Sequence, residues 1–180
     1  MKNSYAWLYL LFFSLSISMT YAQKYPDLDS SPADISYLRD KSKLPLVKVI
    51  YSRPQKKGRT IFGELEPYGK VWRTGANEAT EIKFFKDAKF GGKDIKAGTY
   101  SLFTIPEKDQ WTIILNSELD TWGAYSYKPE KDILRVVVKP ITAHAAIEAL
   151  TIFFKDTEQG GDLIIAWDKT QVEVPIVIAK

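Results

Sequence analysis

Residues 98–116 read GTYSLFTIPEKDQWTIILN, and they indicate the fold class more clearly than any other part of the chain. Residues 98–105 are rich in aromatic and β-branched side chains and end at Pro106. Residues 111–116 are of the same kind, and the four residues between the two runs are polar. Two short apolar runs separated by a few polar residues are typical of a β-hairpin. The sequence therefore predicts strands at 98–105 and 111–116.

The same kind of pattern recurs on both sides of this hairpin. In residues 46–52, Val47, Val49 and Tyr51 fall on one face of a strand, whereas Lys48 falls on the other. Short strands separated by turn residues about every 8–12 positions are typical of a β-sandwich or jelly roll. We therefore predict an all-β fold, a single-domain antiparallel β-sandwich of jelly-roll-like type. Further strands are expected at 35–38, 80–85, 134–139, 147–155, 163–167 and 171–178, the last two joined by residues 168–170.

Residues 53–79 form one long stretch without clear alternation. In a compact all-β domain, a connection of this length is usually functional or carries a short helix of its own. We therefore expect residues 53–79 to contribute to function or to contain a short helix.

The composition limits the chemistry. The chain of 180 residues is 45% hydrophobic and 26% charged, which is typical of one globular domain. Cysteine is absent and a single histidine is present, so thiolate catalysis, disulfides and the usual zinc sites are excluded. We predict no metal site and no cofactor. The formal net charge of +3 is too mild to indicate a nucleic-acid partner.

Residues 1–22 have the layout of a cleaved secretory signal peptide. Lys2 precedes an apolar stretch, residues 6–19, and Thr20-Tyr21-Ala22 resembles a signal peptidase site. The stretch is too short to span a membrane, and no second apolar run follows it. We therefore expect a β-sandwich domain at residues 23–180 that is exported to the periplasm or the exterior and soluble after cleavage.

Several motifs resemble those of a bacterial family known as domain of unknown function 2911. The resemblance covers nearly all of residues 23–180, and it departs from the expected pattern at Glu66, where an apolar residue would be usual. It implies an exported, mostly β domain and brings no established activity, so no catalytic role is transferred. The motifs are Tyr51–Pro54, Lys57–Arg59, Ile61–Gly63, Pro67–Thr80, Gly91-Gly92, Lys96–Pro106, Trp111-Thr112, Trp122–Tyr125, Leu134–Val136 and Trp167-Asp168.

The segment Trp72–Glu78 gathers varied chemistry in seven residues. Trp72 could stack on a ring, Arg73 could bind an anion, and Asn77 and Glu78 could form hydrogen bonds with a polar ligand. Gly75 would allow a positive φ or a close backbone approach. The alternative is a structural loop, in which Trp72 fills one end of the sandwich and Arg73 pairs with Glu78.

Two further groups are candidates for ligand binding. Residues 53–59 contain four cations, and Arg53 and Arg59 at its ends are the ones expected to be ordered. Such a run could attract an anionic ligand, although many basic runs are only solvated loops. Trp122 and Tyr125 flank a glycine in a predicted loop, where an aromatic ring can serve as a ligand platform or as core.

An enzyme would have to depend on carboxylates. Two of them about 5–9 Å apart would suit glycoside hydrolysis, but sequence does not give that distance. The catalytic residues are therefore left unassigned. Our expectation is a non-catalytic module that binds a glycan, a peptide, an anionic small molecule or an envelope component. The alternatives are a carboxylate-dependent hydrolase of glycans or peptides and a structural interaction protein of the cell envelope. The available carboxylates are Glu64, Glu66, Glu78 and Glu81.

Overall fold

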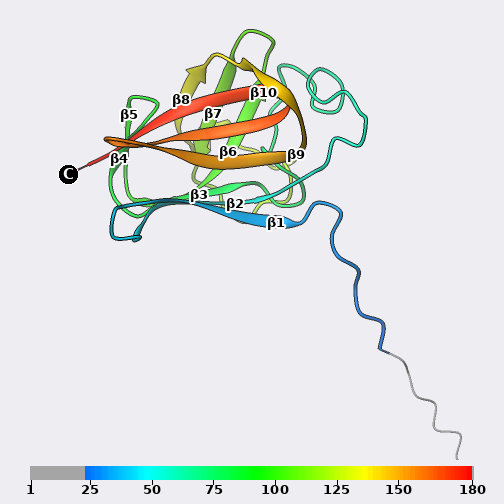
Figure 1. Cartoon of the computed structure of the whole chain (residues 1–180), viewed down its shortest axis with the longest axis horizontal. Helices are drawn as coiled ribbons and strands as arrows, with labels where there is room; N and C mark the ends of the chain where they lie inside the picture. The colour runs from blue at the N-terminus through cyan, green and yellow to red at the C-terminus, as the bar shows by residue number, and fades with distance from the viewer. Residues whose placement is uncertain (1–22, 180) are drawn as a thin grey trace, which may run out of the picture.

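The structure is a computed structural model that describes residues 23–179. Within these residues, ten β-strands form two sheets, with a single turn of 3₁₀ helix between two of them (Figure 1). The elements are β1 (Ala33–Arg39), β2 (Pro45–Ser52), β3 (Glu81–Phe84), β4 (Ala88–Phe90), β5 (Lys93–Ile95), β6 (Gly98–Pro106), β7 (Trp111–Asn116), η1 (Pro129–Lys131), β8 (Asp132–Val138), β9 (Ile141–Thr157) and β10 (Gly160–Ile178).

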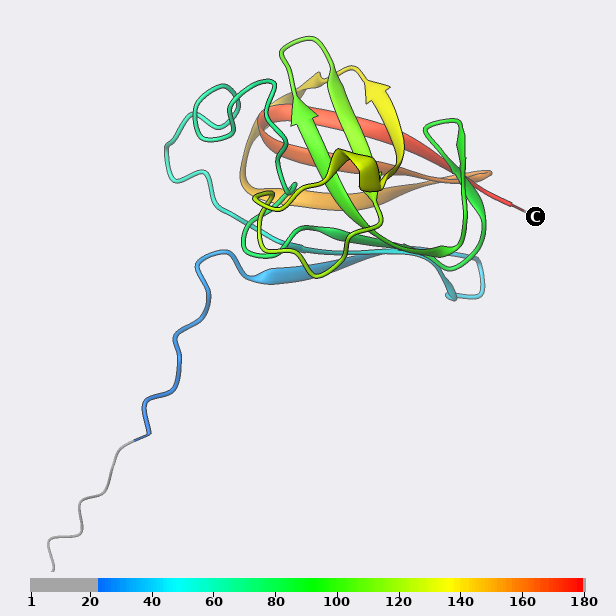
Figure 2. The same cartoon turned by 180° about the vertical axis from the view of Figure 1, so that it is seen from behind.

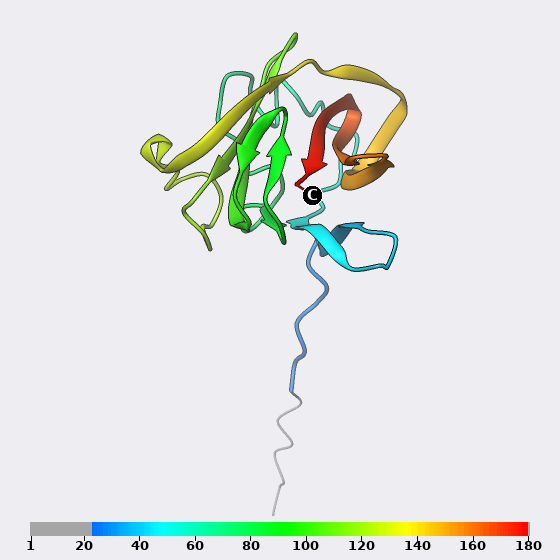
Figure 3. The same cartoon turned by 90° about the vertical axis from the view of Figure 1, so that its left-hand side faces the viewer.

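The two sheets pack face to face as a sandwich. One has the strand order β1-β2-β3-β6-β7-β8 and the other has the order β5-β4-β10-β9. Every strand pair is antiparallel. Figure 3 shows the two layers side by side, with β6 and β7 in green and β10 in orange and red. The predicted antiparallel β-sandwich is confirmed.

The β6–β7 hairpin forms where the sequence predicts it. Its register pairs Leu102 with Leu115 and Phe103 with Ile114. Leu102 and Leu115 face the main core, whereas Phe103 and Ile114 belong to a second, smaller cluster on the opposite face. Both faces of the hairpin are therefore covered, which explains why its strands are apolar almost throughout.

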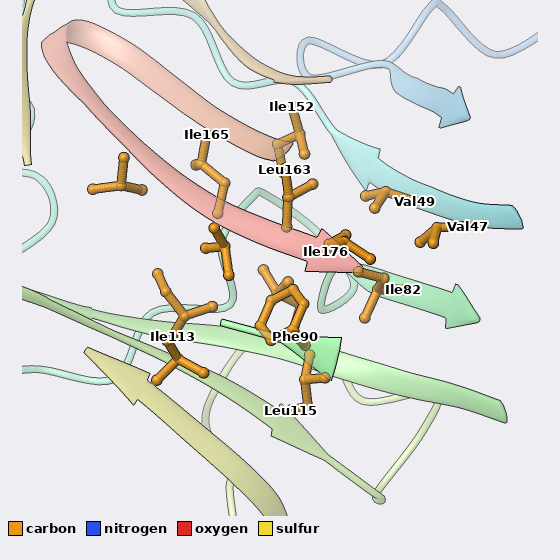
Figure 4. Packing of buried hydrophobic residues seen from close by; sticks show 14 of the residues in the cluster. Val47, Val49, Ile82, Phe90, Ile113, Leu115, Ile152, Leu163, Ile165 and Ile176 are labelled. Atoms are coloured by element: carbon orange, nitrogen blue, oxygen red, sulfur yellow. The ribbon is translucent and has the colours of Figure 1, made fainter. Parts of the chain in front are cut away.

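The main core lies between the sheets (Figure 4). Val47 and Val49 on β2 are fully buried, as their alternation with Lys48 predicts. Opposite them, β10 contributes Leu163 and Ile165. Full burial of such a side chain stabilises a fold by about 1.5–3 kcal/mol, so the inward row of each strand fixes its register.

Strand β10 folds back on itself. A straight strand of its 19 residues would be about 60 Å long. However, a Cβ added to Gly160 would lie only 2.3 Å from the carbonyl oxygen of Ile176. The N–H of Ile178 also donates to the carbonyl of Gln159 (3.1 Å). The two ends of β10 are therefore neighbours, and Figure 4 shows its ribbon folding back. The register with β9 shifts on both sides of Asp168, whose φ is +51°, so we place the bend there. The runs predicted as two strands, residues 163–167 and 171–178, belong to one strand in the structure, and the contacts between its two ends agree with their predicted pairing.

The two ends of the sandwich differ. The β10 bend lies at one end, where residues 23–32, here called the lead-in, approach β1 (Figure 1). At the other end, the N–H of Ala179 donates to the carbonyl of Asp87 (3.0 Å). Among residues 23–179 no helix has the length and apolar character needed to cross a bilayer. The predicted signal peptide, residues 1–22, lies outside the described residues.

Candidate functional site

Residues 53–80, here called the connection, join β2 to β3 at the end of the sandwich that holds the β10 bend (Figure 2). All of these residues are described, and they contain turns and isolated bridges but no helix, so the expected short helix is not found there. The Leu150 N–H donates to the Pro54 carbonyl (2.9 Å), and the Trp72 N–H donates to the Thr104 carbonyl (2.7 Å). The connection is therefore tied to both sheets.

Trp72 lies in the core. Only 4% of its surface is exposed, and its indole Nε1 donates to the carbonyl of Gly75 (3.1 Å). Its ring stacks on Trp167 with a centroid distance of 5.9 Å and meets Trp111 edge-on. The prediction that Trp72 stacks on a ligand does not fit this position, because no free face of the ring remains. The alternative expectation, in which Trp72 fills one end of the sandwich, describes what is observed.

The backbone after Trp72 makes a tight loop. Thr74 and Asn77 have positive φ values of +56° and +59°, whereas Gly75 does not. A Cβ on Gly75 would lie 3.2 Å from the backbone oxygen of Ser52. Gly75 therefore favours close approach to β2, the second of the two roles expected for it.

A cleft of about 430 Å³ opens between the connection, the lead-in and the β10 bend. This volume lies within the range of about 300–1,000 Å³ that is usual for small-molecule sites. The side chains around it are mostly polar and basic, and a single one is acidic. The residues that line it include Ser30, Ser31, Lys57, Arg59, Glu66, Arg73 and Trp167.

Glu66 is the acidic side chain in this cleft, and it is partly buried. Burial raises the pKa of its carboxyl to about 7, and the charges of Arg73 and Arg59 offset part of that rise. Within residues 23–179 the carboxylate accepts no hydrogen bond and forms no ion pair within 4.0 Å. A carboxyl group of this kind can exchange a proton near neutral pH and can donate or accept a hydrogen bond.

Arg73 and Arg59 supply positive charge to the cleft. Arg73 uses only its Nε, which donates to the carbonyl of Gly75 (3.2 Å). Its two terminal nitrogens form no hydrogen bond within the described part of the chain. Arg59 is held more firmly, because its Nε donates to Lys56 (2.9 Å) and its Nη2 donates to Gln55. Arg73 is therefore the arginine with the most donors available to a ligand.

Arg53 does not line the cleft. Its Nη1 pairs with Asp34 (3.0 Å), its Nε donates to the carbonyl of Leu150 (3.0 Å), and its Nη2 donates to Thr151 (2.9 Å). These contacts join β1, the connection and β9. Arg53 is therefore a link between the sheets rather than a member of the cleft.

The remaining candidates lie beside the cleft rather than in it. Asn77 Nδ2 donates to Asp29 Oδ1 (3.2 Å) in the lead-in. Glu78 is exposed, and its backbone forms an isolated β-bridge with that of Trp122. Glu78 makes no ion pair with Arg73, so the expected structural lock between Arg73 and Glu78 is absent. Trp122 and Tyr125 are 60% and 87% exposed.

Sequence reasoning missed most of what makes the cleft. Glu66 is one of the four candidate carboxylates, and the signal that singles it out is its departure from the pattern of the family that the chain resembles, which has an apolar residue there. Trp167 gave no functional signal, because it belongs to the apolar run of residues 163–167, which is typical of a buried strand. Ser31 lies in a polar segment without any pattern.

No group of three or more His, Cys, Asp or Glu side chains able to bind a metal ion occurs among residues 23–179. The cleft instead combines a guanidinium with available donors, a second cation and a carboxyl group that titrates near neutral pH. This arrangement can bind an oxyanion through charge-assisted hydrogen bonds.

Comparisons with known proteins give one match. The model of a family described as "Protein of unknown function (DUF2911)" matches residues 31–176. No curated protein and no solved structure matches the chain. Since residues 31–176 cover most of the chain, the protein belongs to the DUF2911 family.

Proposed function

We propose that this protein is an exported, non-catalytic module whose cleft binds a polar anionic ligand. The observation that carries the proposal is Arg73: a partly buried guanidinium that lines the cleft and keeps both terminal nitrogens unused within residues 23–179. Carboxylate and phosphate groups accept hydrogen bonds from these two nitrogens in parallel. Arg59 and Lys57 add to the positive potential that would attract such a group.

Glu66 is compatible with an anionic ligand because of its raised pKa. A carboxyl group with a pKa of about 7 is protonated in a large fraction of molecules at neutral pH. The protonated form does not repel an anion, and its O–H can donate a hydrogen bond to a ligand oxygen. The side chain that would otherwise oppose anion binding can therefore contribute to it.

The hydrolase alternative has one supporting observation, the same carboxyl group, which could act as a general acid near neutral pH. Glycoside hydrolysis of the usual kind needs a second carboxyl group about 5–9 Å away. Among the described residues that line the cleft, Glu66 is the single acid. Binding without catalysis is therefore the better-supported function.

The proposal is tested by titrating residues 23–180 with glucuronate and inorganic phosphate at millimolar concentration, followed by two-dimensional NMR. We expect shifts in the amide signals of the connection and the lead-in. Arg73→Ala should abolish these shifts while leaving the melting temperature nearly unchanged, because the side chain makes one hydrogen bond and no ion pair.

Arg39→Ala is the matched control. It removes the same charge from β1, where Arg39 makes a single hydrogen bond to the backbone of Lys43. Its titration should be like that of the unaltered protein. If neither anion perturbs the cleft, or if both variants weaken binding equally, the proposal is wrong.

A further inference from the structure

Two large aromatic side chains are exposed on residues 117–127, here called the aromatic loop. Trp122 is 60% exposed and Tyr125 is 87% exposed. Scattered exposed aromatics are common, but these two lie three residues apart in one loop. Other apolar side chains of the same loop, Ala124 and Tyr127, pack against the outer face of the β6–β7 hairpin. The exposed rings are therefore carried on a loop whose underside is held by packing.

The backbone of the aromatic loop is fixed to the connection. The N–H of Gly123 donates to the Asn77 carbonyl (3.0 Å), and the N–H of Ala79 donates to the Thr121 carbonyl (2.9 Å). A third hydrogen bond joins Ser101 Oγ on β6 to the Glu118 carbonyl (2.6 Å). Because the loop is ordered before any ligand arrives, a ligand that stacks on its rings loses little affinity to loop ordering.

Arg73 links the aromatic loop to the cleft. A Cβ placed on Gly123 would lie 3.1 Å from Arg73 Nη1 and 2.8 Å from the ring of Tyr125. The guanidinium and the tyrosine ring therefore lie against the same glycine. Because both distances start from one point, Arg73 Nη1 and the nearest atom of the Tyr125 ring are at most about 6 Å apart. The φ of +70° favours glycine at position 123, and a Cβ there would also crowd the two side chains.

Groups of both charges lie next to the aromatic loop. Arg73, near Gly123, belongs to the cleft together with Arg59 and Lys57. Glu78, which forms a β-bridge with Trp122, and Asp120 of the loop itself line a separate pocket of about 210 Å³. A ligand that spans the cleft and this pocket would carry its anionic group at the cleft and hydroxyl donors at the carboxylates.

We propose that the ligand is an acidic oligosaccharide, which binds an acidic sugar in the cleft at Arg73 and stacks the next sugar on Tyr125 and Trp122. This inference rests on the proposed function and adds a subsite and a ligand class to it. Apolar C–H faces of sugar rings suit aromatic surfaces, and hydroxyl groups suit Glu78 and Asp120. A nucleic acid fits less well, because its next phosphate would meet those two carboxylates.

The test compares three probes by titration: glucuronate, a tetrasaccharide in which glucuronate alternates with N-acetylglucosamine, and the neutral N-acetylglucosamine tetramer. We expect the acidic tetrasaccharide to bind most tightly. Tyr125→Ala should weaken its binding about tenfold while leaving glucuronate binding unchanged, since stacking on an aromatic ring contributes about that factor. Arg73→Ala should weaken both acidic probes. Tyr37→Ala, which removes an exposed tyrosine from β1, is the matched control and should have no effect.

The outcomes separate this inference from the proposed function. If glucuronate binding depends on Arg73 but the tetrasaccharide gains nothing from Tyr125, the aromatic subsite is wrong and the anion site stands. If no acidic probe binds, both are wrong. A single-stranded oligonucleotide that binds more tightly than the tetrasaccharide, and does so through Tyr125, would overturn the saccharide assignment. Tyr125→Ala is expected to fold normally because the side chain is 87% exposed.

Discussion

Glu66 is the side chain that most clearly separates the cleft from an ordinary surface. It lies partly buried without a hydrogen-bond partner in the described residues, and burial raises the pKa of its carboxyl to about 7. The folded protein therefore holds this proton more tightly than the unfolded chain does. The stability that results is fully present below about pH 4.5, the ordinary pKa of a glutamate, and is lost as the pH rises through about 7.

We predict that Glu66→Gln removes this pH dependence. Between about pH 5 and pH 8, the unaltered protein should lose of the order of 1–3 kcal/mol of unfolding free energy that the variant retains. Urea denaturation at a series of pH values measures this difference. Glu64→Gln, an exposed neighbour in the connection, is the control and should follow the unaltered protein. Parallel curves for Glu66→Gln and the unaltered protein would show that the carboxyl is not buried as described.

At the same scale, the sequence predicted residue types better than residue roles. Arg59, Arg73 and the exposed Tyr125 are polar or aromatic residues in loops, and the structure places them in or beside the cleft. Trp72 and Arg53 have the same chemistry but are used internally, one in the aromatic core and the other between the sheets. What distinguishes the two groups is whether a partner already occupies the polar atoms, which sequence does not show.

Among the elements, the turn between β4 and β5 closes the sandwich at one edge. Gly91 and Gly92 form this turn, with φ values of +57° and +81°. A Cβ on Gly91 would lie 2.3 Å from Val136 Cγ1 on β8, in the opposite sheet, whereas a Cβ on Gly92 would have no neighbour within 4 Å. The two glycines share a positive φ, which would strain any residue with a Cβ, and they differ in the space around them.

This difference gives a matched pair of variants. We predict that Gly91→Ala destabilises the protein by about 1–3 kcal/mol more than Gly92→Ala, because overpacking adds to the backbone strain that both variants carry. Thermal or urea unfolding measures the difference. Adding Val136→Ala to Gly91→Ala should recover part of the loss. Equal destabilisation by the two single variants would mean that β4, β5 and β8 do not pack as described.

The sequence pattern predicted most strands and missed the two shortest. Strand β2 could be predicted because an inward apolar row repeats over several residues, and the β6–β7 hairpin because two apolar runs enclose four polar residues. Strands β4 and β5 have three residues each, too few to show a period of two. The connection could be recognised only as a segment without alternation, because its shape depends on hydrogen bonds to strands far away in the sequence.

At the scale of the whole molecule, the proposal that the protein is exported rests on residues 1–22. We predict that the chain is cleaved after Ala22, because residues 1–22 carry the pattern of a secretory signal peptide. N-terminal sequencing of the protein from the extracytoplasmic fraction of its host should begin at or near Gln23. Recovery of protein that begins with Met1 from that fraction would contradict the prediction.

The cleft itself is a property of the whole molecule. Its walls come from the lead-in, from two separate parts of the connection and from the β10 bend, so residues as distant in sequence as Ser30, Arg73 and Trp167 line one space. Each segment could be assigned to a strand or a loop from its own pattern. Their convergence depends on how β10 folds back and how the connection is tied to both sheets. For this reason the fold was largely predictable and the cleft was not.

The placement of the cleft at the β10 bend determines how the protein should be attached to a sensor surface. Ala179 lies at the opposite end of the sandwich, next to Asp87. The last residues of the lead-in, Ser30 and Ser31, line the cleft, and Figure 1 shows the lead-in and the C-terminus on opposite sides of the molecule. A biotin or affinity tag coupled after residue 180 would hold the molecule with its cleft pointing into the flowing sample. A tag before residue 23 would hold the molecule by the lead-in, whose last residues line the cleft, and the surface would then hinder the entry of a ligand into the cleft.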